Sequence, residues 1–357
     1  MEVKSLYIHY PHCLHLCNYC DFYKKVFDSN SNKNFFKYLI DSLTPLESLL
    51  RSKSFALGDL ETIYIGGGTP SLWGEDVIRF VDFFHDYFKI NFSPREFTME
   101  VDPGTFKEES IRSLVDFGVN RFSLGIQSFD KDIFPILDRS HEFEEIEKTL
   151  SFFSKLGVNF SVDFMIGLPE KGKKRDIESE LRKINDFGPK HISLYILTVG
   201  ESYPHSEFIP NDEIVSQEYL KVFEVMSEIG FNQYEVSNYA KSGFESIHNW
   251  KYWKQDSYIA LGTSATGLLV NDKGLRFKWR PDGTFLEENL THSQLELERL
   301  YTMSRTREGI DCSEFSKQAL NELSNWRARN LGRFKGDRFI FNEHGFVILD
   351  SLISKII

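Results

Sequence analysis

The stretch SLYIHYPHCLHLCNYC, residues 5–20, joins a short β-rich run to a loop that carries three cysteines. Cys13, Cys17 and Cys20 fall within eight positions of one another, directly after the run SLYIHY. Three sulfurs with the spacing C-x3-C-x2-C on one tight loop can converge on one face of a metal centre and leave one coordination position open. We therefore expect a metal or redox site immediately after the first strand of the fold.

Length, charge and cysteine content restrict the class of protein. A chain of 357 residues suits one large domain with smaller additions, and a net charge of −11 makes nucleic acid and anionic membranes poor partners. The sequence shows neither a signal-peptide pattern nor a run approaching the roughly 18 apolar residues of a spanning helix. We expect a cytoplasmic protein without an integral membrane segment. In that compartment its four cysteines are not a disulfide framework.

β-rich runs alternate with amphipathic helical segments through the first two hundred residues. This alternation predicts a parallel sheet with right-handed crossovers, either doubly wound or most of a barrel. Polar and glycine-bearing positions follow the predicted strands, where ligands bind in both architectures. The predicted strands are residues 5–10, 62–67, 96–102, 120–127, 160–167 and 191–197, and the predicted helices are 34–50, 75–88, 108–118 and 142–157.

The pattern changes after Pro204. A long helix over 211–230 is followed by an aromatic, less regular stretch to about residue 285. The chain then reads as helices that end in a strand pair over 337–349, around the turn N-E-H-G, which resembles a winged-helix module. We expect three parts: a core over 1–200, a middle region over 201–288 and a C-terminal domain over 289–357.

The residues alone leave several interpretations of the cysteines open. Zinc completed by His12 or His15 is one alternative, a disulfide is a weaker one, and a [4Fe-4S] cluster is the third. The spacing resembles the signature of the radical S-adenosylmethionine (SAM) superfamily. A second motif supports this resemblance, since Gly66, Gly67 and Gly68 follow the second predicted strand. Alone they suit a sharp β-to-α turn; in the superfamily such a stretch receives the methionine amino group of SAM.

Most of the chain resembles the coproporphyrinogen dehydrogenase (HemN) group of this superfamily, and its haem chaperone branch, HemW, most closely. The matching stretches include YIHYPHC, GGGTPS, EVDPGTF, LDRSH, DFMIGLP, YEVSNYA and HNWKYW. The resemblance implies an α/β fold, a radical SAM partial (β/α)6 TIM-like barrel with a small C-terminal winged-helix-like domain. It implies that Cys13, Cys17 and Cys20 hold the cluster and that SAM is contacted by Tyr7, Gly67, Gly68, Thr69, Glu100, Gln127, Arg139 and Asp163. From the residues alone, Asp163 suits equally a buried carboxylate satisfied by Arg139.

Two local features separate the branches of the group. Phe22 stands where porphyrinogen-oxidising members carry a further cysteine, and only twelve residues precede Cys13. His248 opens the stretch HNWKYW, which matches the H-N-x-x-Y-W motif associated with haem binding in the chaperone branch. A histidine among aromatic residues is also commonly just a packed residue. The glycine and alanine stretch that follows the motif in the family departs here, reading GTSATG over 262–267.

The resemblance implies a haem chaperone that binds a [4Fe-4S] cluster, SAM and haem and transfers haem to an acceptor protein. One rival is oxygen-independent coproporphyrinogen III oxidation, and another is a radical SAM enzyme acting on a different substrate. Radical chemistry would require an electron donor such as flavodoxin or ferredoxin. The sequence leaves open whether SAM is cleaved and whether the protein is an enzyme.

Overall fold

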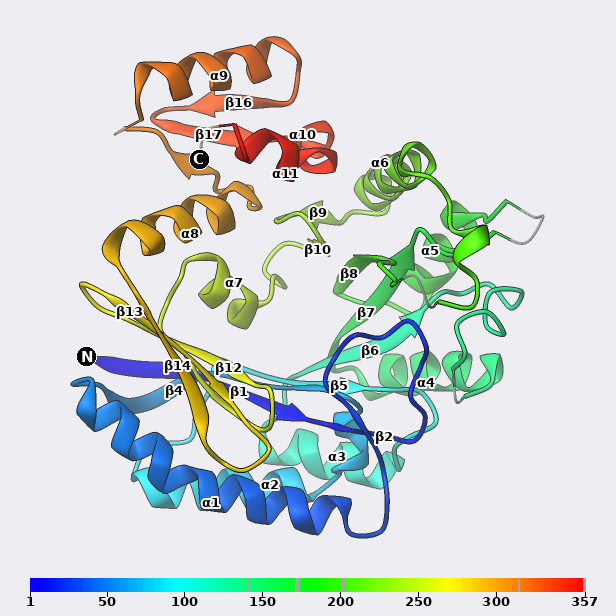
Figure 1. Ribbon diagram of the computed structural model, residues 1–357. Helices are drawn as coiled ribbons and strands as arrows, with labels where there is room; N and C mark the ends of the chain where they lie inside the picture. Colours follow the sequence, from blue (N-terminus) through cyan, green and yellow to red (C-terminus); the bar gives the residue numbers. More distant parts are fainter. Residues whose placement is uncertain (140, 171–173, 201–202, 314, 356–357) are drawn as a thin grey trace.

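The computed structural model describes residues 1–139, 141–170, 174–200, 203–313 and 315–355 (Figure 1). Its main element is a sheet in the order β11-β1-β4-β5-β6-β7-β8-β10-β9. The six consecutive strands from β1 to β8 pair in parallel, and they match the six strands predicted from the sequence. The partial (β/α)6 barrel is thus confirmed, with strands β1 (Glu2–Tyr10), β4 (Ala56–Gly67), β5 (Glu96–Val101), β6 (Arg121–Gln127), β7 (Asn159–Ile166) and β8 (His191–Ile196).

Helices cover the outer face of this curved sheet (Figure 1). Apolar residues on each helix pack in one continuous core with the outward-facing residues of the strands, such as Ile63, Phe97 and Val162. Residue 140, inside the predicted stretch LDRSH, lies outside the described residues. The helices are α1 (Ser31–Ser52), α2 (Asp76–Phe88), α3 (Glu108–Phe117), α4 (Phe143–Leu156), α5 (Ile177–Asp186) and α6 (Asp212–Glu228).

The inner face of the sheet is polar. Because successive side chains of a strand point to opposite faces, the neighbours of the apolar core residues line the barrel interior. Buried polar groups need hydrogen-bond partners, and here they find them across strands. Ser123 donates to Asp163, the ring of His191 bonds Ser161, and Tyr64 donates to Glu100. The interior is therefore a connected set of polar side chains.

The middle of the chain adds strands to both ends of the sheet. Strand β11 (Ile259–Leu261) pairs in parallel with β1, while β10 (Asn238–Ala240) pairs antiparallel with β8 and with β9 (Asn232–Gln233). A separate antiparallel meander follows, made of β12 (Thr266–Val270), β13 (Gly274–Trp279) and β14 (Phe285–Leu290). Residues 201 and 202, where the expected boundary of the core falls, lie outside the described residues, and the three-part division stays a prediction.

The C-terminal part forms a small module on the far side of α8 (His292–Ser304), at the top of Figure 1. Its sheet has the order β15-β17-β16, with β15 (Ile310–Asp311), β16 (Gly332–Lys335) and β17 (Arg338–Phe341), and α9 (Lys317–Ala328) precedes the hairpin. This is the winged-helix-like domain. Of the strand pair predicted over 337–349, the first strand is β17, and the second is wrong. The stretch N-E-H-G begins a helix, because the Asn342 side chain accepts from Gly345 N at 3.0 Å and caps α10 (Glu343–Val347), which α11 (Leu349–Ile353) follows. Among the helices described, none has the length and apolar character needed to cross a membrane.

Candidate functional site

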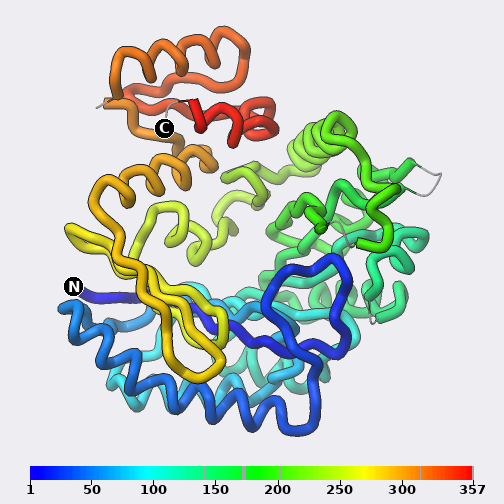
Figure 2. Tube along the Cα trace, in the orientation of Figure 1, coloured from blue at the N-terminus to red at the C-terminus, as the bar shows by residue number. Residues whose placement is uncertain are grey.

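The three N-terminal cysteines lie on a loop whose two ends are held together. Strand β2 (His12–Cys13) pairs in parallel with β3 (Lys25–Val26), and Lys25 N donates to Pro11 O at 2.7 Å. Phe27 N likewise donates to Cys13 O at 2.8 Å. The loop can be followed in Figure 2 as the dark blue segment after β1. This closure brings the two ends of the cysteine loop together, and the loop is also tied to the chain after β6 by an ion pair between His15 and Asp138.

All three cysteines line one pocket of about 340 Å³. Burial raises the pKa of the Cys13 and Cys17 thiols, and the nearby Arg139 guanidinium acts in the opposite direction on Cys17. The fourth cysteine, Cys312, is buried elsewhere, in the C-terminal module. Three thiols in the lining of one pocket are a donor set that fits an iron–sulfur cluster with one iron left for another ligand.

The predicted SAM residues lie in the same pocket, with the exception of Tyr7. The loop of three glycines brings backbone unusually close to the cysteines. A Cβ on Gly68 would lie 2.9 Å from Cys13 Sγ, and Gly67 adopts a φ of +119°, which side chains disfavour. The pocket residues from the prediction are Gly67, Gly68, Thr69, Glu100, Gln127, Arg139 and Asp163.

Two buried carboxyl groups lie at the inner end of this pocket. Burial, reinforced by the charge of Asp163, raises the pKa of Glu100 to about 7. Burial also raises the pKa of Asp163 to about 6, against the hydrogen bonds that it accepts from Ser123 and Ser193. Glu100 accepts hydrogen bonds from Gly67 N at 3.0 Å and from Tyr64 at 2.9 Å. A cationic ligand group would favour ionisation of both carboxyls, so this end of the pocket suits a positively charged ligand.

Arg139 pairs with a carboxylate other than the one considered from the sequence. It donates to Asp102, to the Tyr19 hydroxyl at 2.9 Å and to Gly125 O at 3.1 Å. Asp102 was missed by the residue-level predictions, although it lies within a stretch that the family resemblance covers and directly follows β5. Tyr19, the aromatic residue before Cys20, fits the cysteine signature of the superfamily.

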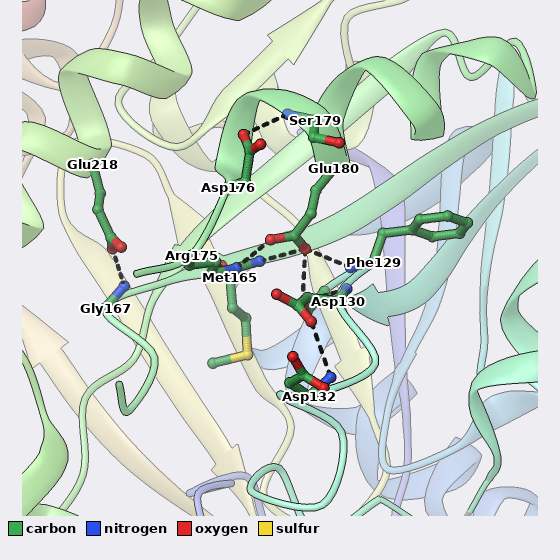
Figure 3. Close-up of polar contacts among 11 residues, drawn as sticks. Phe129, Asp130, Asp132, Met165, Gly167, Arg175, Asp176, Ser179, Glu180 and Glu218 are labelled. Carbon is green, nitrogen blue, oxygen red and sulfur yellow. Dashed lines mark hydrogen bonds and ion pairs between the residues drawn. The ribbon is translucent and has the colours of Figure 1, made fainter. Parts of the chain in front are cut away.

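A buried ion pair connects the segment after β6 with the end of β7, which carries the pocket residue Met165 (Figure 3). Arg175 bonds Glu180 at 2.5 Å and donates to Met165 O at 2.5 Å. Glu180 also accepts from Ser128 at 2.7 Å and from Phe129 N at 2.6 Å. Because one carboxylate contacts the segment after β6 and its arginine contacts the end of β7, the ion pair fixes both pocket loops relative to each other.

Tyr7 faces a neighbouring pocket. Its hydroxyl lies 3.0 Å from His9 Nδ1, and His9 Nε2 lies 2.9 Å from Tyr23 O. A carbonyl only accepts, so His9 carries its proton on Nε2 and Tyr7 donates to Nδ1. This second pocket has about 380 Å³ and shares Asp21 and Phe22 with the cysteine pocket.

His248 lies inside the protein, on α7 (Ile247–Trp253), with an exposed fraction of 0%. Its Nδ1 lies 2.8 Å from Thr62 Oγ1 and its Nε2 lies 2.7 Å from the Tyr252 hydroxyl. Burial lowers the pKa of His248 to about 3, so the ring is neutral. Both ring nitrogens are engaged, and within the described residues His248 is in the wall of neither pocket. This arrangement does not fit axial ligation of haem iron by His248.

Comparison with known proteins agrees with this site. Residues 7–178 match the model of the radical SAM superfamily. The haem chaperone HemW of Haemophilus influenzae is 31% identical, and the alignment covers 98% of this chain and 96% of that protein. The chain belongs to the HemW family of radical SAM proteins. A mitochondrial radical S-adenosyl methionine domain-containing protein 1 from Danio rerio is 32% identical over 99% of this chain and 86% of its own length.

The fold has a solved counterpart that extends over nearly the whole chain. Coproporphyrinogen III oxidase (HemN) from Escherichia coli, described as a radical SAM enzyme, superposes with a TM-score of 0.81 at 16% identity. The alignment covers 99% of this chain and 90% of that one. At this identity the likeness establishes that the HemW-family chain shares the architecture of HemN, including the part after the barrel.

Proposed function

We propose that this protein is a haem chaperone, which binds a [4Fe-4S] cluster and SAM in the cysteine pocket, takes up haem nearby and passes it to an acceptor protein. The observation that carries the proposal is the match to HemW chaperones over nearly the full length of both chains. The cysteine pocket supports it independently, because its three sulfurs are the donor set that a cluster with one open iron requires.

In this proposal Cys13, Cys17 and Cys20 hold the cluster, and the pocket beside them receives SAM. Gly67, Gly68 and Thr69 let the backbone approach the ligand, which any larger side chain at the glycines would prevent. Glu100 and Asp163 face the positively charged groups of SAM, and Arg139, Gln127 and the neighbouring Tyr7 contact the rest of the ligand. When bound, the cluster would supply an open coordination position and a source of one electron.

The wider setting of the site belongs to the same proposal. The ligand to be carried is haem, and its acceptor is a separate protein. Any cleavage of SAM would need an electron donor such as flavodoxin or ferredoxin, and the place of action is the cytoplasm. The proposal does not include a bond between His248 and iron, since both ring nitrogens have partners.

The cluster is tested by anaerobic reconstitution with iron and sulfide. We expect about four iron atoms per chain and a brown colour, both lost in Cys13→Ala, Cys17→Ala and Cys20→Ala. Cys312→Ala is the matched control, because Cys312 is buried in a distant module and should leave iron content unchanged. Unchanged iron content in the three N-terminal variants would reject the site.

The function is tested on the reconstituted protein. Added haem should give a saturable Soret band, and the band should decline when an apo-acceptor protein is supplied. Incubation of the reduced protein with SAM and coproporphyrinogen should yield no protoporphyrinogen. Formation of protoporphyrinogen would replace the chaperone assignment by an oxidative decarboxylase.

A further inference from the structure

The second pocket has a wall made largely of aromatic rings. Tyr7, Tyr23, Tyr252 and Tyr258 line it together with His9 and Phe22. The rings of Tyr252 and Tyr258 pack edge to face, with centroids 4.6 Å apart. These residues come from β1, from the segment after the cysteines, from α7 and from the chain just before β11. Flat apolar faces with hydroxyl tips suit a planar aromatic ligand with polar edges.

We propose that this tyrosine pocket binds the tetrapyrrole, and that His248 acts from behind it by holding Tyr252 in the wall. The inference rests on the proposed function, because it places the cargo of the chaperone. It assigns to His248 the role of a positioning residue, in place of an iron ligand.

The contacts of α7 support this role. His248 and Tyr252 are four residues apart and so lie on the same face of the helix. The imidazole bridges the Tyr252 hydroxyl and Thr62 of β4, which ties the tyrosine to the barrel. Tyr252 lines the pocket, whereas the His248 ring is enclosed behind it. A motif that contains both residues can therefore affect tetrapyrrole binding without any histidine–iron bond.

Charge also distinguishes the two pockets. The cysteine pocket contains the carboxyls Glu100, Asp102 and Asp163, together with the cations Lys24 and Arg139, whereas Asp21, at the shared edge, is the one carboxylate that the described residues contribute to the lining of the tyrosine pocket. Beside the tyrosine pocket, Thr266 of β12 is directly opposite Lys278 of β13. Side chains of directly paired residues lie on the same face of a sheet, so the exposed Lys278 side chain begins on the face from which Thr266 enters the pocket lining. The Lys25 ammonium lies 5.7 Å from the centre of the Tyr23 ring. In this proposal Lys25 and Lys278 pair with the two propionates of the tetrapyrrole.

The size of the pocket suits a carrier. A volume of about 380 Å³ is at the lower end of the roughly 300–1,000 Å³ typical of ligand pockets. A tetrapyrrole would be held by one part of its ring system, with its propionate edge near the rim lysines and in contact with water. Partial exposure leaves an edge that an acceptor protein can engage.

The test uses the reconstituted holoprotein and two probes, hemin followed by its Soret band and iron-free protoporphyrin IX followed by fluorescence. Thr266→Trp fills the pocket, and Lys278→Glu reverses an exposed charge without disturbing the core. We expect each substitution to lower the affinity for both probes, by about tenfold or more for Thr266→Trp and by a few fold for Lys278→Glu. Thr284→Trp and Lys273→Glu, exposed positions in the same meander, should leave both affinities unchanged.

His248→Gln separates the two roles of the histidine. A positioning role predicts equal losses of affinity for hemin and protoporphyrin IX, with the Soret maximum and spin state of bound hemin unchanged. A ligand role predicts a changed spin state and unaltered protoporphyrin IX binding, and this result would overturn the inference. So would unchanged binding of both probes in Thr266→Trp and Lys278→Glu.

The inference and the proposed function can fail separately. If wild-type protein gives no saturable Soret band, the chaperone function is rejected. Protoporphyrin IX binding that Thr266→Trp abolishes would still support the tyrosine pocket as a tetrapyrrole site. If wild-type protein binds hemin and the pocket variants bind it equally well, only the pocket assignment is rejected.

Discussion

Gly68 shows how the cysteine pocket depends on a single missing side chain. Its backbone N donates to Tyr10 O at 2.7 Å, so the residue is fixed at the end of β1. A Cβ at this position would lie 2.9 Å from three atoms: Cys13 Sγ, His12 O and a backbone carbon of Pro11. Two of these atoms are backbone and cannot rotate away, so a larger residue must displace the cysteine loop.

We expect Gly68→Ala to reduce the iron bound after reconstitution and to weaken SAM binding by about tenfold or more, because it shifts Cys13 relative to Cys17 and Cys20. Iron content per chain and SAM titration by calorimetry measure the two effects. Gly200→Ala is the control, since its Cβ meets no atom within 4 Å. Wild-type iron content in Gly68→Ala would show that the close approach is not needed.

His248 marks the limit of inference from single residues. The sequence shows the motif and its aromatic neighbours, but it cannot show that both imidazole nitrogens find partners inside the fold. Thr62, one of those partners, is 186 positions away. The cysteines and glycines, in contrast, could be predicted because their chemistry depends on local spacing.

At the scale of elements, the buried pair Arg175–Glu180 connects α5 to the loops after β6 and β7 (Figure 3). Removing one partner of a buried pair leaves an uncompensated charge. We expect Glu180→Gln to lower the free energy of unfolding by about 3 kcal/mol.

Urea unfolding measures this loss. Glu178→Gln, on the same helix, is the control, because Glu178 pairs with Arg182 and Lys221 in ion pairs open to solvent. Such exposed pairs contribute less than about 1 kcal/mol. Equal effects of the two substitutions would argue against a special role for the buried pair.

Helix α7 is held at its start by a carboxylate from the barrel. Glu96 of β5 accepts from Ile247 N at 2.8 Å, from His248 N at 2.9 Å and from the Ser246 hydroxyl at 3.1 Å. We expect Glu96→Gln to destabilise the fold by about 1–3 kcal/mol and to weaken protoporphyrin IX binding, because Tyr252 lies on this helix. Glu245→Gln, one residue before Ser246, keeps an oxygen that can accept from Gly243 N and should change neither thermal unfolding nor porphyrin fluorescence.

The six parallel strands were predictable because each is a β-rich run that alternates with an amphipathic helical segment or a glycine-bearing turn. The additions to the sheet were not, since β9, β10 and β11 have only two or three residues and owe their form to tertiary pairing. The C-terminal hairpin was placed too late because Asn342 serves as a helix cap instead of a turn residue.

For the whole molecule, the buried carboxyls make stability depend on pH. Glu100 and Asp163 have pKa values of about 7 and about 6 in the folded chain, above their ordinary values of 4.5 and 3.8. At a pH between the ordinary and the raised pKa of each carboxyl, the folded chain binds more protons than the unfolded chain. The free energy of unfolding therefore carries a contribution that is full at acidic pH and is lost as the pH rises to about 7.

We expect Glu100→Gln to reduce this decline, so that the variant gains on the order of 2 kcal/mol relative to wild type between about pH 5 and about pH 8. Urea unfolding of the cluster-free chain across this range measures the difference. Glu108→Gln, an exposed carboxyl on α3, should leave the pH profile unaltered. A wild-type profile in Glu100→Gln would mean that Glu100 ionises normally in the folded chain.

Asp21 and Phe22 line both the cysteine pocket and the tyrosine pocket, so this short segment separates the two ligand sites. A displacement of the segment by an occupant on one side alters the shape offered on the other. Thermodynamic linkage makes this effect reciprocal. If a ligand in one pocket changes the affinity of the other pocket by some factor, the second ligand changes the affinity for the first by the same factor. Uptake and release of the tetrapyrrole would thus depend on whether the cysteine pocket is occupied, and this coupling needs no conformational change of the barrel.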